Sequence, residues 1–173
     1  LKDLIRAHFP EEAKAAFTDP LLFGDFKLFN SQEDVKIYED LGDYNDLRTV
    51  FEEMMITYNE RNASSKMNLV LFDYALEHLT RIIRIIRRPR GHALLVGVNG
   101  SGRQSLTRLA AFASGYGVFT ITLSRGFGDE QFRENLKDLY RQLGLDNKQL
   151  VFMFTDAHVV KEGFLEYINN LLT

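Results

Sequence analysis

The sequence holds 173 residues, of which 45% are hydrophobic and 26% are charged, and its formal net charge is -3. This length is enough for one ordinary domain with a hydrophobic core. The lack of cysteine excludes a disulfide framework and thiolate chemistry, and it fits a reducing compartment such as the cytoplasm. No long uncharged apolar run occurs, so we expect no membrane span. The chain starts at Leu1 without a signal peptide, and we expect a piece of a longer protein.

Positive charge is concentrated in the middle of the sequence. Residues 78–128 contain no aspartate or glutamate but carry Arg81, Arg84, Arg87, Arg88, Arg90, Arg103, Arg108 and Arg125. A cationic stretch around a glycine-rich loop suits a small anionic ligand. We expect neither nucleic acid nor a membrane as a partner, and we expect the arginines between 81 and 88 to lie on a solvated helix face.

Residues 1–66 are predicted to form a helical and irregular section. A short amphipathic helix over residues 4–13 is broken near Pro10, and turns are expected at Asp19-Pro20 and Gly24-Asp25. The buried anchors of this section are Leu21, Leu22, Phe23, Phe26 and Phe29. A helix capped by Asp46 is predicted to reach Glu60, and its apolar face consists of Leu47, Val50, Phe51, Met54 and Met55.

Residues 67–173 alternate between helix and strand patterns and form the second predicted unit. Apolar residues at three- and four-residue steps predict a long helix over residues 69–88. Strands are predicted over residues 92–96, 118–123 and 150–154, and helices over residues 103–113, 129–143 and 161–172. This alternation predicts an α/β sandwich with a parallel sheet and right-handed crossovers.

A glycine-rich loop follows the first predicted strand. Its residues are Gly97, Val98, Asn99, Gly100, Ser101, Gly102, Arg103, Gln104 and Ser105. Backbone N–H groups at such a loop and at the following helix N-terminus hold phosphate oxygens closely. The usual phosphate-loop pattern is G-x-x-x-x-G-K-[ST], and here Arg103 replaces the lysine and Gln104 replaces the hydroxyl that binds Mg²⁺. The alternative is a strand-to-helix turn that binds nothing.

An acidic residue is expected at the end of the predicted strand over residues 150–154, where Thr155 and Asp156 follow. In one register Asp156 takes the place of the catalytic acid and Thr155 that of the metal acid. In the other register Asp156 is the metal acid and the catalytic base is missing. Asp156 is therefore the one catalytic candidate, and Asp156 and Gln104 are the candidate Mg²⁺ ligands. The alternative is that Asp156 only caps a helix after the strand.

Two histidines and one asparagine lie next to predicted strands and helices. His92 and His158 lie near predicted strand ends, but two separate histidines do not make a metal site. Asn68 lies between Met67 and Leu69, just before the predicted long helix. It either caps that helix or contacts an adenine ring.

Residues 67–72 and 89–110, together with residues 21–26, 154–156 and 163–172, resemble the fourth AAA+ module of axonemal dynein heavy chains. The resemblance implies a three-layer P-loop NTPase fold of the AAA+ kind, truncated before its later strands and helical lid. It also implies ATP or ADP, with Mg²⁺, bound by phosphate contacts at residues 100–105 and adenine contacts near residues 67–69.

The same resemblance implies a place in a ring of AAA+ modules that drives a microtubule motor in the axoneme of cilia and flagella. Expected partners are neighbouring modules of the heavy chain, the intermediate and light chains of its complex, and microtubules through regions outside this segment. We expect regulatory binding of nucleotide with little or no hydrolysis. The alternatives are a stand-alone kinase-like P-loop enzyme and a structural ring segment with an empty loop.

Overall fold

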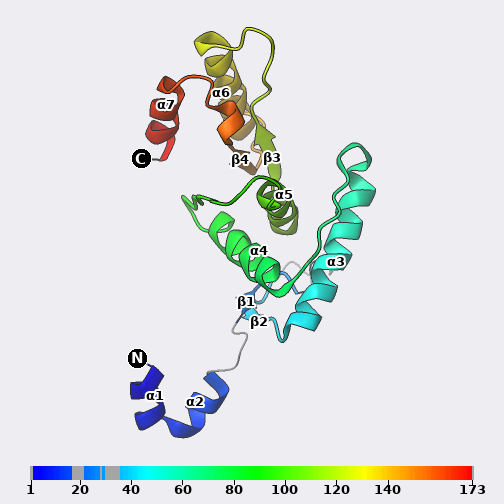
Figure 1. Cartoon of the computed structure of the whole chain (residues 1–173), viewed down its shortest axis with the longest axis vertical. Helices are drawn as coiled ribbons and strands as arrows, with labels where there is room; N and C mark the ends of the chain where they lie inside the picture. Colours follow the sequence, from blue (N-terminus) through cyan, green and yellow to red (C-terminus); the bar gives the residue numbers. More distant parts are fainter. Residues whose placement is uncertain (1, 17–21, 28, 30–35, 173) are drawn as a thin grey trace.

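The computed structural model describes residues 2–16, 22–27, 29 and 36–172 (Figure 1). The chain begins with α1 (Lys2–His8) and α2 (Pro10–Ala16), which pack against each other. The expected break near Pro10 is confirmed. Strand β1 (Phe23–Gly24) pairs antiparallel with β2 (Glu39–Asp40). The predicted turn at Asp19-Pro20 and the anchor Leu21 lie outside the described residues. Phe26 is buried as predicted, whereas Phe23 is exposed and its prediction as a buried anchor is wrong.

Helix α3 (Tyr44–Arg61) begins earlier than predicted, because Asp43 rather than Asp46 caps it. The Asp43 carboxylate accepts hydrogen bonds from the backbone N–H groups of Asn45 and Asp46, at 2.7 and 2.9 Å. This satisfies two donors that a helix N-terminus leaves without partners. The predicted apolar face is confirmed, with Leu47 and Phe51 buried. A short 3₁₀ turn, η1 (Ala63–Ser65), follows.

Helix α4 (Asp73–Ile86) begins later than the predicted residue 69. Its N-cap residue is Phe72, so Asn68 does not cap it, and that interpretation of Asn68 is wrong. The backbone before residue 73 is held instead by side chains of α3, which removes it from the helical hydrogen-bond pattern. The spacing of apolar residues in the sequence gives no sign of these backbone contacts with α3.

Helix α5 (Arg103–Ser114) follows the glycine-rich loop as predicted and ends at Gly115, whose φ is +77°. The chain continues through β3 (Gly117–Thr120), α6 (Asp129–Gly144), β4 (Leu150–Met153), the 3₁₀ turn η2 (Asp156–His158) and α7 (Gly163–Leu172). Strands β3 and β4 are parallel, with Gly117 opposite Leu150. The α/β class with a parallel sheet is confirmed.

The strand predicted over residues 92–96 is not formed in the described structure. Its residues Leu94 and Val96 are 90% and 85% exposed, and Val98, just beyond it, is 79% exposed. A strand forms only when a neighbour pairs with its backbone, and the two strands of the sheet pair with each other. We call residues 92–98 the leader segment.

The interior consists of two hydrophobic clusters. The larger joins α3, α4 and α5, and its fully buried members include Phe51, Leu76, Leu79 and Leu109. The smaller joins Ile121, α6 and α7. In it the rings of Phe132 and Phe164 stack with centroids 4.2 Å apart and planes 7° apart. Among the described residues, no helix combines the length and the apolarity that a membrane crossing requires.

Arg87 departs from the solvated face expected for the arginines of α4. Its guanidinium forms an ion pair with Asp25 and donates a hydrogen bond to the carbonyl of Ala113 at 2.9 Å. Burial lowers the pKa of Arg87 from its usual value. Arg87 therefore ties the end of α4 to both the β1 region and α5, whereas Arg81, Arg84 and Arg88 are exposed as expected.

Candidate nucleotide-binding site

The glycine-rich loop has the backbone conformation that its sequence predicts. Gly100 and Gly102 have φ values of +80° and +77°, in the left-handed region that favours glycine. A Cβ placed on Gly97 would lie 3.0 Å from Ser101 Oγ, so a side chain there would crowd the loop. Three glycines thus allow the chain to turn tightly without side chains in the way.

The first turn of α5 offers backbone N–H groups at the end of this loop. Gly102 is the N-cap residue, and no side chain caps the helix. The first intrahelical bond runs from the N–H of Leu106 to the carbonyl of Gly102, at 2.8 Å. The preceding N–H groups of Arg103, Gln104 and Ser105 are those that a helix leaves for an external acceptor. Together with the helix dipole they favour an anion at this point.

Arg103 lies across the loop. Its guanidinium donates weakly to the carbonyls of Leu95 and Val98, at 3.4 and 3.5 Å. The charge therefore stays beside the loop, although its prediction as the residue nearest the terminal phosphate is not tested by these contacts. Gln104 is exposed, and Ser105 is partly buried.

Asp156 is exposed and begins η2, with two residues between it and the end of the parallel strand β4 at Met153. It is not the cap of this turn, since Thr155 is the N-cap residue. No hydrogen bond joins Asp156 to Gln104 in the part of the chain that the structure describes. Nor do the described residues hold a cluster of three or more metal-binding side chains. Gln104 and Asp156 are both exposed, and their role as Mg²⁺ ligands stays a prediction.

His158 is a structural residue whose role the sequence analysis missed. Its ring is buried, and its Nδ1 accepts a hydrogen bond from the backbone N–H of Thr155 at 3.0 Å. Nδ1 is therefore unprotonated, and burial lowers the pKa of His158. The spacing from Thr155 to His158 is that of a capping box, which was the available signal. His158 fixes the turn on which Asp156 stands.

The predicted adenine segment lies along α3. Met67 is buried and Leu69 partly buried, while Asn68 is exposed. The Leu69 side chain reaches to 3.6 Å from the place that a Cβ on Gly102 would take. The structure therefore places the predicted adenine segment close to the end of the phosphate loop, although the two are far apart in the sequence.

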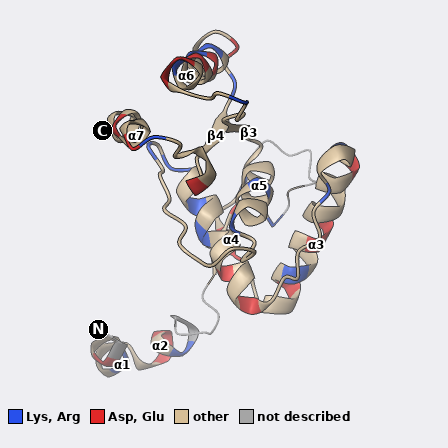
Figure 2. Cartoon of the chain, turned by 45° about the horizontal axis from the view of Figure 1, so that its top comes forward, with Lys and Arg blue, Asp and Glu red and all other residues tan. Residues whose placement is uncertain are grey.

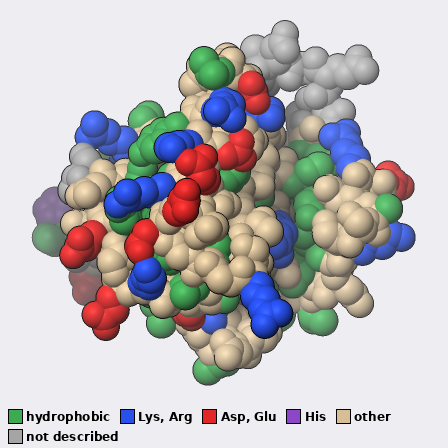
Figure 3. Space-filling model, turned by 90° about the horizontal axis from the view of Figure 1, so that it is seen from above, with side chains coloured by type: hydrophobic (Ala, Val, Ile, Leu, Met, Phe, Trp, Pro, Cys, Tyr) green, Lys and Arg blue, Asp and Glu red, His purple; other side chains and the backbone are tan. Residues whose placement is uncertain are grey.

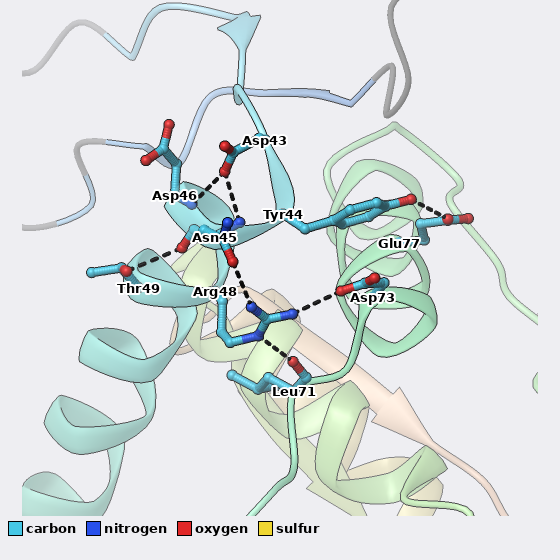
Figure 4. Close-up of polar contacts among 9 residues, drawn as sticks. All are labelled: Asp43, Tyr44, Asn45, Asp46, Arg48, Thr49, Leu71, Asp73 and Glu77. Atoms are coloured by element: carbon cyan, nitrogen blue, oxygen red, sulfur yellow. Dashed lines mark hydrogen bonds and ion pairs between the residues drawn. The ribbon is translucent and has the colours of Figure 1, made fainter.

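Polar contacts fix the junction between α3 and the start of α4 (Figure 4). The Arg48 guanidinium donates to the carbonyl of Leu71 at 2.8 Å and to the carboxylate of Asp73 at 2.7 Å. The Tyr44 hydroxyl donates to Glu77 at 2.8 Å. These contacts join the helical section before residue 67 to the unit that carries the loop.

Charge is distributed unevenly along α4, with Asp73 and Glu77 in its first half and arginines in its second (Figure 2). Acids near an N-terminus and bases near a C-terminus stabilise a helix dipole. This arrangement accounts for the α4 arginines without any ligand. The face seen from above shows hydrophobic side chains between charged ones at the surface (Figure 3).

A glycine loop that enters a helix, together with a parallel strand that an acid follows, is typical of P-loop nucleotide-binding modules. The sequence model of the family described as P-loop containing dynein motor region D4 matches residues 67–173. The chain belongs to this family.

The chain is also similar to long axonemal and flagellar proteins. It is 56% identical over 170 residues to dynein axonemal heavy chain 10 of Homo sapiens, which covers 98% of this chain. It is 52% identical over 179 residues to the dynein-1-alpha heavy chain of the flagellar inner arm I1 complex of Chlamydomonas reinhardtii, which covers 100% of this chain. The chain spans 4% of the length of each of these curated relatives.

Proposed function

We propose that this chain is the nucleotide-binding, regulatory fourth AAA+ module of an axonemal dynein heavy chain. The observation that carries the proposal is the loop itself, with Gly100 and Gly102 in left-handed conformations ahead of an uncapped helix N-terminus. The names of the relatives support a place in the cytoskeleton of the axoneme of a cilium or flagellum. Partners are the neighbouring modules of the same heavy chain, microtubules through other regions, and intermediate and light chains.

The ligand is ATP or ADP. Its phosphates lie at residues 99–105, Arg103 stands nearest the terminal phosphate, and the adenine lies near Met67, Asn68 and Leu69. When present, Mg²⁺ neutralises phosphate charge, and Gln104 and Asp156 are the side chains that would hold it.

The module binds nucleotide without rapid turnover. Gln104 offers an amide where a hydroxyl is usual, and Asp156 stands as a single exposed carboxylate. Loss of a positioned base typically lowers a rate by about 10²–10⁴-fold. We expect the purified segment to hydrolyse ATP well below about 1 s⁻¹, the low end of ordinary enzyme rates. Faster steady turnover would overturn the regulatory assignment.

The binding test uses the intact heavy chain that carries this segment. 2-Azido-ATP is photolysed on the protein, and labelling of the peptide containing residues 67–72 is quantified by mass spectrometry. Unlabelled ATP and adenosine then compete for this site. Arg103→Ala should weaken competition by ATP about 10–100-fold, the size of one or two charge-assisted hydrogen bonds, and leave adenosine unchanged.

The matched control is Arg108→Ala, which removes a partly buried arginine further along α5. It should leave competition by both ligands unchanged. Equal losses for ATP and adenosine in Arg103→Ala would show that this charge does not act on phosphate. Absence of specific labelling in the unmodified chain would overturn the proposed function.

A further inference from the structure

The extended segment that precedes α4 is held by one face of α3. Asn59 binds the backbone of Met67 at two points: its Nδ2 donates to the Met67 carbonyl at 2.9 Å, and its Oδ1 accepts from the Met67 N–H at 2.8 Å. The Met55 sulfur accepts from the Leu69 N–H at 3.5 Å. Arg48 binds the Leu71 carbonyl, as described above.

These contacts follow a regular register. Positions 48, 55 and 59 are seven and four residues apart, which places them on one face of a helix. From 48 to 59 a helix rises about 16 Å at about 1.5 Å per residue. An extended chain covers about 13 Å from residue 67 to 71 at about 3.3 Å per residue. The two lengths match closely enough for α3 to hold every second residue of the segment.

The register decides which residues of the segment face outward. Met67 and Leu71 are buried and Leu69 is partly buried, whereas Asn68 is exposed and Val70 is 81% exposed. Asn59 binds both hydrogen-bonding groups of the Met67 backbone, and the Met67 N–H therefore has no further capacity to donate to a ligand. The Asn68 side chain has no hydrogen bond within the described residues, and its amide carries both a donor and an acceptor.

We propose that Asn59 is a positioning residue for base recognition, which fixes the Met67 backbone so that the Asn68 amide faces the purine ring. This inference rests on the proposed nucleotide-binding function. An amide that pairs with the N6 donor and the N7 acceptor of adenine discriminates against guanine, which presents two acceptors, O6 and N7, at the same edge. The Leu69 side chain lies close to Gly102, which places this segment near the phosphate loop.

The test repeats the labelling of residues 67–72 in the intact heavy chain, with ATP, GTP and inorganic triphosphate as competitors. Asn59→Leu keeps the size of the side chain but removes both hydrogen bonds. It should reduce the preference for ATP over GTP by about tenfold, because the loss of one good bidentate base contact has an effect of about this size. Competition by triphosphate should stay unchanged, because it has no base. An unchanged ATP-to-GTP ratio would overturn the positioning role, whereas equal weakening of all three competitors would show that Asn59 acts only on overall structure.

Two further variants keep the proposal falsifiable if Asn59→Leu does not fold. Asn68→Ala changes an exposed side chain and should lose the same base preference, and retention of that preference would overturn the proposal. Asn62→Leu is the matched control, since the Asn62 amide donates to the carbonyl of Tyr58 within its own helix end, at 2.9 Å. Loss of base preference in this control would also overturn it. If the unmodified chain is not labelled, the proposed function fails; if it is labelled and Asn59→Leu keeps its preference, only the present inference fails.

Discussion

The cluster of α3, α4 and α5 and the leader segment are both rich in aliphatic residues, yet their surroundings are opposite. Leu76 and Leu79 in α4 are fully buried, whereas Leu94 and Val96 in the leader are 90% and 85% exposed. A helix satisfies its backbone hydrogen bonds within itself and needs only side-chain contacts to become stable. A strand needs neighbouring strands for both purposes, and the described residues supply none to the leader. Apolar sequence alone therefore does not determine burial.

The largest expected effect is the difference in stability between two variants, one that shortens a buried aliphatic side chain and one that shortens an exposed one. Leu79→Ala should destabilise the chain by about 2–5 kcal/mol, because it leaves a cavity in the larger cluster. Val96→Ala should change the free energy of unfolding by less than about 0.5 kcal/mol, as exposed substitutions usually do. Urea denaturation of both variants measures the difference. A comparable loss of stability in Val96→Ala would show that the leader segment is packed in solution, and it would contradict the difference between the two regions.

A smaller effect separates strain from ligand binding at two glycines. Gly102 and Gly115 share a φ of +77°, and no atom lies within 4 Å of a Cβ placed on Gly115. Alanine at either position should cost about 1–2 kcal/mol for the left-handed conformation. Only Gly102→Ala should also weaken ATP, because it alters the end of the phosphate loop. Thermal unfolding and ATP competition at residues 67–72 measure the two effects. If Gly115→Ala weakened ATP as much as Gly102→Ala, the cause would be general instability rather than the loop.

The smallest effect concerns the end of the paired strand β4. Burial lowers the pKa of His158, so the unfolded chain takes up a proton first as the pH falls. Stability should therefore decrease as the pH falls below about 6.5, the usual histidine value. Protonation would also remove the acceptor that Nδ1 offers to Thr155. The urea midpoint at pH 7.5 and 5.5 should show a drop that is reduced in His158→Asn. The control variant His78→Asn, at an exposed position of α4, should show the full drop of the urea midpoint. If the drop were reduced equally in His78→Asn, it could not be assigned to His158.

Local sequence signals predicted most of the helices but not the contacts between distant segments. Helix α5 begins at Arg103 as expected, because glycine and the loop motif mark its start in the sequence itself. The start of α4 was predicted too early, since Leu69 and Phe72 fit a helical period while Asn59 and Arg48 hold the backbone there in another conformation. The leader strand was predicted from its composition, but its pairing depends on segments remote in sequence.

The candidate site likewise combines features that local sequence predicts with features that depend on contacts between distant segments. The loop glycines and the uncapped helix start could be predicted because each follows from consecutive residues. The approach of Leu69 to Gly102 depends on the folded arrangement. The hydrogen bond from Thr155 to His158 joins residues three apart, so its spacing was a local signal. Arg87 illustrates the limit most clearly: the α4 sequence places it among exposed arginines, while its partners Asp25 and Ala113 come from elsewhere in the chain.

The packing of α3, α4 and α5 also bears on the order in which the chain folds. These helices contact one another and follow each other along the chain, and the last of them ends at Ser114. Contacts between segments close in sequence form quickly, because little chain entropy is lost in closing the loops between them. The helical cluster can therefore assemble during synthesis before β4 has been made. The phosphate loop lies between α4 and α5, so both of its ends would be fixed as soon as α5 packs against α3 and α4.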